Sequence, residues 1–252
     1  MRPGTEIEFL EWRHLEIHKM GDEPVLYAHI QRGKTVKKNK PMGAVLHRSC
    51  WLLLEKIRQY TPEGTFKAFE KHLPRLKAMG VDILWFMPIQ PIGKLNRKGS
   101  MGSYYSISNY EEVNPDFGTQ EDFNRIVDSA HALGMKVILD WVANHTSFDH
   151  NWVTDRPDFY TKDSLGNSPI VALDNDGKGT DWTDVADLNY NERDVMGAMT
   201  ESMRHWVIAS NIDGFRCDVA GFVPLEFWEI AIPRLKETKK DLFFLAEWED
   251  PK

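Results

Sequence analysis

The sequence is poor in cysteine and has no long apolar run. Its two cysteines, Cys50 and Cys217, form no C-x-x-C pair, so a cysteine-bound metal site is not indicated. No stretch approaches the ~20 apolar residues of a membrane-spanning helix, and residues 1–20 lack the apolar segment of a signal peptide. We therefore expect no membrane partner and a cytoplasmic location for the chain as written, while export of a longer parent protein stays open.

The chain also has no excess of positive charge, because Asp and Glu outnumber Lys and Arg by 38 to 31. The chain of 252 residues has a formal net charge of −7 at pH 7, which argues against a nucleic-acid partner, because such proteins present a basic surface. The basic run "RGKTVKKNK" (32–40) is interpreted as a solvated loop. Hydrophobic residues make up 42% of the sequence, which is ordinary for a globular protein with its own core.

From about residue 50 onward, apolar strand-like runs alternate with helical patterns. Such alternation is typical of a parallel sheet in βα units, whose strands are buried on both faces. A doubly wound sheet and a (β/α)8 barrel both fit, and the barrel is favoured because no glycine-rich dinucleotide turn follows any strand. After a short apolar run over 50–60, the periodicity predicts helices over 64–80, 119–134, 191–211 and 224–240, the last kinked at Pro233, and strands over 81–89, 135–142, 212–220 and 241–248.

Two parts of the chain break this alternation. The stretch that begins at Asn144 and ends at Tyr190 is too long for a simple βα loop, so we interpret 145–190 as an irregular inserted subdomain after the third strand. Residues 1–50 show no clear pattern and stay unassigned, although "PVLYAHI" (24–30) could be a strand. The predicted organisation is α/β: a partial (β/α)8 barrel over residues 51–252, with the insertion inside it.

Ionisable residues lie near the carboxyl ends of three predicted strands. Asp140 lies near the end of the third strand, Arg216 and Asp218 lie in the fourth, and Glu247 lies near the end of the fifth. In barrel enzymes this end of the strands carries the active site. Side chains two residues apart share a strand face, so Arg216 and Asp218 should both point into the barrel, while their neighbours point toward the helices.

The surroundings of these acids favour two different roles. An arginine beside Asp218 favours its charged form, which suits a nucleophile. The apolar sequence "LFFLA" before Glu247 would raise a carboxyl pKa, which suits a general acid. Glycoside hydrolysis requires such a pair. Salt bridges or helix caps would explain each acid singly, and an unrelated barrel with Asp140, His145 and Asp218 as metal ligands is a further alternative.

Five stretches resemble conserved regions of the α-amylase family, glycoside hydrolase family 13, in the order of that family. "VILDWVANHTS" (137–147), "DGFRCDVA" (213–220) and "FFLAEWEDP" (243–251) are similar to its first, second and third regions. "VADLN" (185–189) resembles the motif near the end of the family's inserted domain, and "GSYYSISNYEEVNPDFGTQEDF" (102–123) resembles the loop after its second strand. The resemblance runs from about Leu54 to Pro251.

The resemblance implies a retaining double-displacement reaction on α-linked glucans such as starch or maltooligosaccharides. Asp218 would be the nucleophile that forms a glycosyl-enzyme ester. Glu247 would protonate the leaving oxygen and then activate water. Arg216 would hold Asp218 charged and aligned.

The resemblance also implies residues that bind the substrate and a metal. Tyr105 and His145 would line the subsite of the reacting sugar together with Asp140, which would be more an organiser of the site. Asn144 and Asp187 match positions that bind a structural calcium in many family members, and oxygen ligands of this kind suit calcium. No other cofactor is implied.

Two departures from the family pattern bear on activity. The family has a further aspartate in an "HD" dipeptide after the seventh strand, but the pattern here ends after the fifth strand and no such dipeptide follows Glu247. Gly221 and Phe222 replace the Lys-His pair of many α-1,4-acting members. The alternatives therefore include a fragment that binds glucan without cleaving it, and a transglycosylase or an α-1,6 or trehalose-type hydrolase. The oligomeric state is open.

Overall fold

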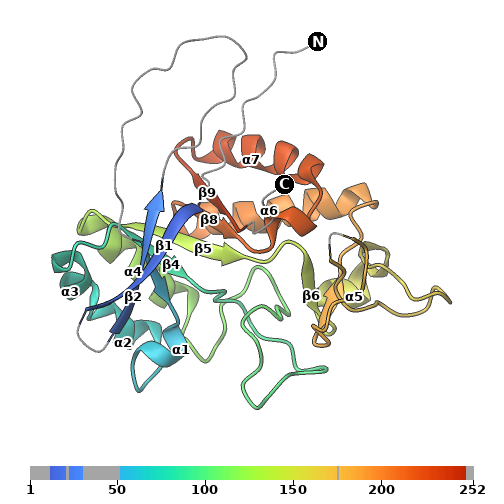
Figure 1. The fold of residues 1–252 in the computed structure, drawn as a ribbon, viewed down its shortest axis with the longest axis horizontal. Coiled ribbons are helices and arrows are strands. Elements are labelled where there is room, and N and C mark those ends of the chain that lie inside the picture. The colour runs from blue at the N-terminus through green and yellow to red at the C-terminus, as the bar shows by residue number, and fades with distance from the viewer. Residues whose placement is uncertain (1–11, 21–22, 31–51, 175, 248–252) are drawn as a thin grey trace, which may run out of the picture.

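The computed structural model describes residues 12–20, 23–30, 52–174 and 176–247 (Figure 1). The basic run at 32–40 and Cys50 lie outside these residues. In the described part of the chain, no helix has the length and apolar character needed to cross a membrane. The elements in chain order are β1 (Trp12–Met20), β2 (Glu23–Ile30), β3 (Leu52–Glu55), α1 (Ile57–Tyr60), α2 (Phe66–Glu70), α3 (Leu73–Ala78), β4 (Ile83–Phe86), α4 (Gln120–Ala132), β5 (Lys136–Trp141), β6 (His145–Ser147), α5 (Asn151–Asp155), η1 (Pro157–Phe159), β7 (Val185–Asp187), α6 (Arg193–Ser210), β8 (Gly214–Cys217), η2 (Ala220–Phe222), α7 (Leu225–Thr238) and β9 (Phe243–Ala246).

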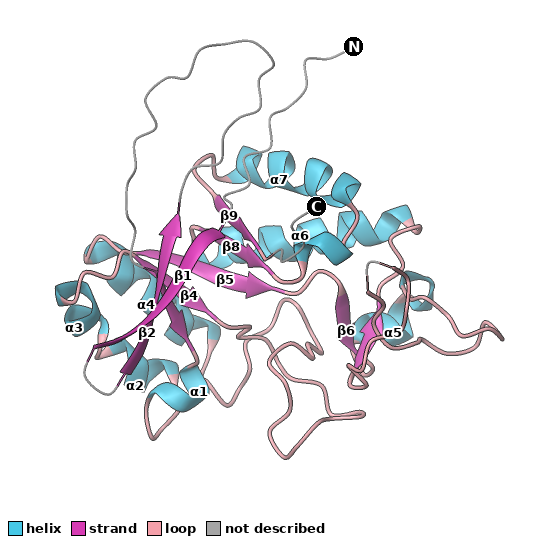
Figure 2. Cartoon of the chain, viewed as in Figure 1, coloured by secondary structure: helices cyan, strands magenta, loops and turns pink. Residues whose placement is uncertain are grey.

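A parallel sheet with the strand order β3-β4-β5-β8-β9 forms the centre of the described chain. At least one helix lies between each strand of this sheet and the next along the chain. Figure 2 shows α6 and α7 beside β8 and β9. The predicted α/β fold built from βα units is therefore confirmed.

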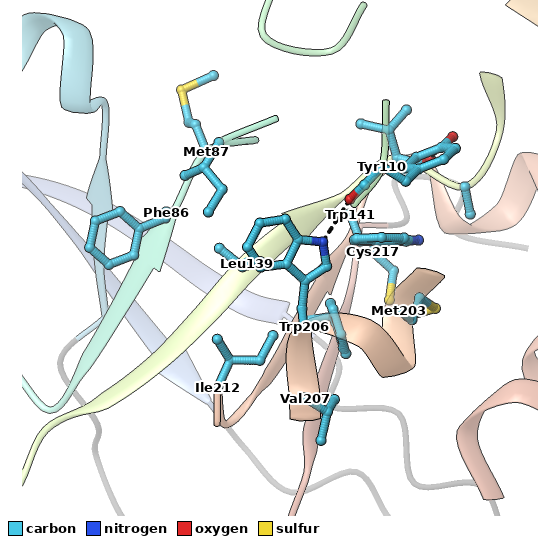
Figure 3. Close-up of a cluster of buried hydrophobic side chains, with 14 of the residues drawn as sticks. Phe86, Met87, Tyr110, Leu139, Trp141, Met203, Trp206, Val207, Ile212 and Cys217 are labelled. Carbon is cyan, nitrogen blue, oxygen red and sulfur yellow. Dashed lines mark hydrogen bonds between the residues drawn. The ribbon is translucent and has the colours of Figure 1, made fainter. Parts of the chain in front are cut away.

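Successive residues of these strands face two separate apolar clusters. The outer cluster, which packs against the helices and is shown in part in Figure 3, includes Leu84, Phe86, Val137, Leu139, Phe215 and Cys217. The inner cluster consists of the buried residues Leu52, Ile83, Trp85, Ile138 and Leu245. Because side chains along a strand alternate between its faces, Asp140 in β5 and Arg216 in β8 lie on the inner face. The predicted orientation of β8 is confirmed.

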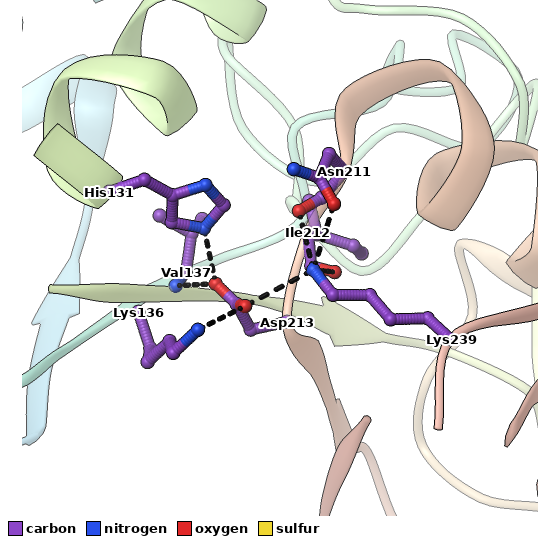
Figure 4. A network of polar contacts seen from close by, with 7 residues as sticks. All are labelled: His131, Lys136, Val137, Asn211, Ile212, Asp213 and Lys239. Atoms are coloured by element: carbon purple, nitrogen blue, oxygen red, sulfur yellow. Dashed lines mark hydrogen bonds and ion pairs between the residues drawn. The ribbon is translucent and has the colours of Figure 1, made fainter. Parts of the chain in front are cut away.

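A buried carboxylate fixes the amino end of β8 (Figure 4). One oxygen of Asp213, Oδ2, accepts a hydrogen bond from the Val137 N–H at 2.9 Å and lies 2.6 Å from His131 Nε2. The other oxygen, Oδ1, lies 2.9 Å from Lys136 Nζ and 3.1 Å from Lys239 Nζ. Burial opposes ionisation of Asp213, but these partners outweigh it and lower the pKa of the carboxyl. The network joins α4, β5, β8 and the end of α7 at the sheet end opposite Asp140.

Two predicted helices contain a proline, and the proline has a different effect in each. The segment 64–80 forms two helices, α2 and α3, because Pro74 at the start of α3 lacks an N–H and cannot continue α2. In contrast, α7 continues through Pro233. The carbonyl of Glu229, four residues earlier, loses its helical partner there, and the exposed position of Glu229 makes water available to it.

The amino-terminal part contains strands where the sequence left residues 1–50 unassigned. β1 and β2 pair antiparallel, so the segment 24–30 is a strand. β1 is not apparent from the sequence, because charged residues interrupt its apolar ones. The first strand of the large sheet, β3, lies within the apolar run 50–60, but residues 57–60 of that run form the helical turn α1.

The predicted insertion lies beyond the carboxyl end of β5. It contains β6, α5 and β7, and β6 pairs antiparallel with β7. Figure 1 shows β6 and α5 past the arrowhead of β5. The insertion is therefore next to the strand end that carries Asp140.

Candidate active site

The inner-face acids of the sheet converge on one arginine. Nη1 of Arg216 donates hydrogen bonds to Asp140 Oδ1 and to Asp218 Oδ1, both at 2.8 Å, and its Nη2 pairs with Glu247. The strand register explains this, because Asp140 lies opposite Arg216 in the β5–β8 pairing. The N–H of Glu247 donates to the Cys217 carbonyl at 3.0 Å, which brings Glu247 beside β8. The structure thus places the four predicted residues together.

Three carboxyls surround a single guanidinium, and burial disfavours the charged forms of the two buried ones, Asp140 and Asp218. Burial raises the pKa of Asp140 to about 6, although its hydrogen bonds and the Arg216 charge oppose this. Burial, and next the neighbouring Asp140 charge, raise the pKa of Asp218 well above its ordinary value, and the opposing Arg216 charge does not cancel them. The expectation that Arg216 keeps Asp218 charged is therefore corrected for the unliganded site, because Arg216 is shared with Asp140 and Glu247.

Two aromatic side chains hold the second oxygen of Asp140. Trp85 Nε1 donates to Asp140 Oδ2 at 3.2 Å, and the Tyr105 hydroxyl donates to the same oxygen at 3.1 Å. The Arg216 guanidinium also lies 5.0 Å from the centre of the Trp85 ring, within the range of a cation–π contact. Burial and the nearby Asp140 charge raise the pKa of Tyr105, so its hydroxyl keeps the proton that it donates. Every polar contact of Asp140 therefore helps to order the site.

Trp85 was missed by the sequence interpretation. The feature that could have revealed it is its position near the carboxyl end of β4. It lies two residues after Ile83 and therefore on the same inner face of the sheet. An indole there can reach the acids of the neighbouring strand. Its apolar sequence neighbours made core packing the simpler interpretation.

His145 lies at the start of β6 beside a pair of stacked aromatic rings. The centroid of its ring is 5.5 Å from that of Trp182, and Trp182 stacks on Phe222 at 6.1 Å with 20° between the ring planes. Burial lowers the pKa of His145 to about 3, against a hydrogen bond with the Tyr105 backbone, so the imidazole is neutral at neutral pH. Because Trp182 and Phe222 are far apart in the chain, the sequence alone did not predict their contact.

The turn that follows Asp218 connects it to Glu247, the other candidate for a reacting carboxyl. Val219 has a left-handed backbone with φ 36° and ψ 47°, which is rare for a β-branched residue. Its N–H donates to Glu247 Oε2 at 3.0 Å, and the Asp218 N–H donates to the Trp141 carbonyl at 2.9 Å. The positions of Asp218 and Glu247 therefore depend on one strained turn.

The two predicted calcium ligands are engaged with other parts of the protein. Asp187 Oδ2 accepts a hydrogen bond from the Thr161 hydroxyl at 2.6 Å, and Oδ1 accepts one from the Leu173 N–H at 2.9 Å. Asn144 Nδ2 lies 3.3 Å from His145 Nδ1. Within the residues that the structure describes, no group of three or more His, Cys, Asp or Glu could hold a metal ion. Calcium takes about 6–8 oxygen ligands, and these two side chains do not fit such a site on their own.

Comparison with known proteins shows which family shares these features. The alpha amylase catalytic domain matches residues 28–170 and 177–245. The alpha-1,4-glucan:maltose-1-phosphate maltosyltransferase of Corynebacterium pseudotuberculosis is 34% identical over 200 residues, covering 73% of this chain and 29% of that protein. Two solved structures are similar, each with a TM-score of 0.73. An alpha-amylase from Lactobacillus plantarum is 39% identical over 78% of this chain and 44% of its own, and a maltogenic alpha-amylase from Thermotoga neapolitana is 38% identical over 80% and 46%.

These matches agree with the architecture of the sheet. The chain spans 29% of the length of the first two curated relatives and less than half of the two solved structures. Its five-stranded sheet is part of the barrel that those amylases form. By the extent of the family match and by its fold, the chain belongs to the alpha-amylase family.

Proposed function

We propose that this chain carries the two reacting carboxyls of a retaining enzyme that acts on α-linked glucans. The observation that carries the proposal is the contact of Arg216 with Asp140, Asp218 and Glu247 at the carboxyl end of the sheet. The names of the relatives support the substrate class, since they are α-glucan maltosyltransferases and amylases.

The reaction takes two steps at the anomeric carbon of a glucosyl unit. In the first step, a carboxylate oxygen of Asp218 attacks this carbon and the glycosidic C–O bond breaks. The electron pair goes to the leaving oxygen, which takes a proton from Glu247, and a glycosyl ester remains on Asp218. In the second step, Glu247 takes a proton from an incoming hydroxyl, whose oxygen attacks the same carbon and releases Asp218. The two inversions retain the anomeric configuration.

The neighbouring residues support these steps in different ways. Asp218 must be charged to attack, and Arg216 stabilises that charged form against burial and the neighbouring Asp140 charge. Asp140 and Asp218 share the Arg216 guanidinium. Hydrogen bonds from Trp85 and Tyr105 to Asp140 reduce its need for the arginine charge. The half-buried Tyr105 and the neutral His145 are suited to contact uncharged sugar hydroxyls, which matches the predicted substrate subsite.

The acceptor of the second step decides between hydrolysis and transfer. Water gives hydrolysis, which we take as the leading function. A sugar hydroxyl gives transfer, which the 34% identity to a maltosyltransferase favours as a second candidate. Phe222, beside Trp182, stands where many α-1,4-acting members carry another residue and bears on the leaving-group preference.

The test measures both outcomes on the purified chain, once its fold is shown by circular dichroism. Starch and maltooligosaccharides are assayed for new reducing ends, and maltose 1-phosphate with a glucan acceptor is assayed for released phosphate. We expect one of these activities, lost in Asp218→Asn and Glu247→Gln and kept in the exposed control Asp241→Asn. Phosphate release without new reducing ends would assign transfer.

The absence of both activities from a folded sample would overturn the proposal for this chain. A retaining mechanism has a second, independent readout. A fluorinated glucosyl donor that slows the second step should leave its sugar on the peptide that contains Asp218, as seen by mass spectrometry. A label on another peptide would overturn the assigned nucleophile.

A further inference from the structure

A pocket on the outer side of the sheet contains two histidines with unused ring nitrogens. It has a volume of about 340 Å³ and lies between the loop 109–112, the start of α5 and the middle of α6. The lining residues that could contact a ligand by hydrogen bonds or ring packing include Glu111, Glu112, His150, Trp152, Ser202 and His205. Of the described residues around it, none belongs to the candidate active site, so the two sites are separate.

The tautomer of His150 is fixed by the backbone. Its Nδ1 accepts a hydrogen bond from the Trp152 N–H at 3.0 Å, so the proton of the neutral ring is on Nε2. Burial lowers the pKa of His150 to about 3, against the nearby Asp149 charge, so the ring is neutral at neutral pH. His150 is 1% exposed, and its Nε2 has no hydrogen-bond partner among the described residues. A donor left in this state favours a ligand that brings an acceptor.

His205 supplies a second unused nitrogen from another element. Its Nε2 is buried and likewise lacks a partner within the described part of the chain. On the same helix, the Ser202 hydroxyl donates to Glu111 Oε1 at 3.2 Å, which fixes one carboxylate at the pocket. Glu112 is exposed beside it, and Trp152 is half-buried and supplies an apolar ring.

These groups select a neutral polyhydroxyl ligand by their chemistry. The two glutamates repel anions, and the neutral His150 ring offers a cation no lone pair, because its Nδ1 already accepts a hydrogen bond and its Nε2 carries the proton. A sugar hydroxyl, in contrast, can accept a hydrogen bond from His150 and donate one to a carboxylate, while the C–H face of the ring packs on an indole. The volume is at the lower end of the roughly 300–1,000 Å³ that small-molecule pockets span. We propose that this pocket binds a glucosyl unit of a maltooligosaccharide, as a carbohydrate site distinct from the candidate active site.

The test uses nitrogen-15 NMR of the imidazole rings in the full chain carrying Asp218→Asn, titrated with maltose. We expect saturable shifts of the His150 and His205 signals, while those of His72 and His131 stay unchanged. His205→Phe, which fills the pocket, should weaken maltose binding at His150 at least about tenfold, equivalent to about 1.4 kcal/mol. Ile208→Phe adds the same ring at a position on α6 that is 58% exposed, and should leave binding unchanged.

The outcomes separate this pocket from the candidate active site. The proposal would be overturned if millimolar maltose shifted neither the His150 nor the His205 signal. It would also be overturned if the shift of the His150 signal survived in a folded sample of His205→Phe. A shift confined to His145 would overturn it too, while supporting sugar binding at the candidate active site. If His205→Phe does not fold, Glu112→Lys at the exposed rim takes its place, and unweakened maltose binding in that variant would count against the proposal.

Discussion

Arg216 is the residue on which the candidate active site depends, because one guanidinium contacts three carboxyls. A lysine offers one compact ammonium group and cannot reproduce these contacts. Arg216→Lys would leave Asp140 or Asp218 buried without its partner. We expect the free energy of unfolding to fall by about 3–5 kcal/mol, measured by urea denaturation at neutral pH.

The control for this change is Arg193→Lys, whose side chain is 88% exposed. An exposed arginine contributes little, so this variant should stay within about 0.5 kcal/mol of the parent. If Arg216→Lys also stayed within that range, the three contacts would not stabilise the fold. The claim that the candidate active site depends on Arg216 would then be contradicted.

The raised pKa of Asp140 predicts a pH dependence of stability. Its folded pKa is about 6, above the ordinary 3.8, so the folded state holds a proton that the unfolded state has lost between these values. Asp140 therefore makes stability fall as the pH rises from about 4 to 6. His145, with its pKa lowered to about 3, acts in the opposite direction, because the unfolded state binds the extra proton there.

A variant isolates the contribution of Asp140 from that of His145. In Asp140→Asn the falling component is absent, so a plot of unfolding free energy against pH should rise more steeply between about pH 4 and 6 than in the parent. The exposed Asp116→Asn serves as the matched control. An identical slope in Asp140→Asn and the parent would contradict a raised pKa at this position.

The identity of the acids could be predicted from the sequence, but their ionisation could not. The period of two along a strand suffices to place Arg216 and Asp218 on one face. Their charge state depends on Asp140 in β5, which lies opposite Arg216 only through the register of the sheet. The local sequence does not show how many carboxyls contact one arginine in the folded protein.

At the scale of elements, Gly214 allows β8 and β9 to pair. Its φ is 156°, and a Cβ atom there would lie 1.9 Å from the Phe243 carbonyl oxygen. Gly214→Ala should push the two strands apart and move Glu247 away from Arg216. We expect a loss of about 2–4 kcal/mol of unfolding free energy, measured by thermal unfolding.

Gly197 in α6 provides the opposite substitution. A Cβ atom there would meet no other atom within 4 Å, so Gly197→Ala should stabilise the helix by about 0.5–1 kcal/mol. Equal effects of the two substitutions would show that close strand contact does not limit residue 214.

Helix prediction succeeded where the local signals agreed and failed where a proline interrupts a helical pattern, whereas strand prediction failed where pairing decided. Thr119 was the expected start of a helix, and it caps α4 in a capping box with Asp122. The break between α2 and α3, in contrast, follows from Pro74 within an otherwise helical pattern. β1 was missed because its strand character comes from pairing with β2, which the apolar pattern does not reveal.

At the scale of the whole molecule, Asp187 connects distant parts of the insertion through Thr161 and Leu173. Because protein donors already occupy both carboxylate oxygens, we expect a chelator such as EDTA to leave the melting temperature unchanged. Asp187→Asn should lower it, since an amide nitrogen cannot accept these hydrogen bonds. A fall on chelation that calcium chloride reverses would contradict this and support the predicted calcium site.

The sequence predicted the parallel sheet and the insertion, but not the second pocket. Strands and helices follow from periodicity, which is local. The pocket combines Glu111, His150 and His205 from segments that are about 40 and 55 residues apart along the chain. Only the folded arrangement of the loop, α5 and α6 brings these residues to one place.

The division of the sheet into inner and outer clusters has a consequence for how the chain tolerates change. Outer positions such as Leu139 need only fill volume against the helices, so apolar residues of similar size should exchange there. Trp85, on the inner face, must fill space and also donate a hydrogen bond to Asp140. Alternate residues of the same strand are therefore open to very different amounts of evolutionary drift, and stability can be re-engineered from the helix side without touching the acids.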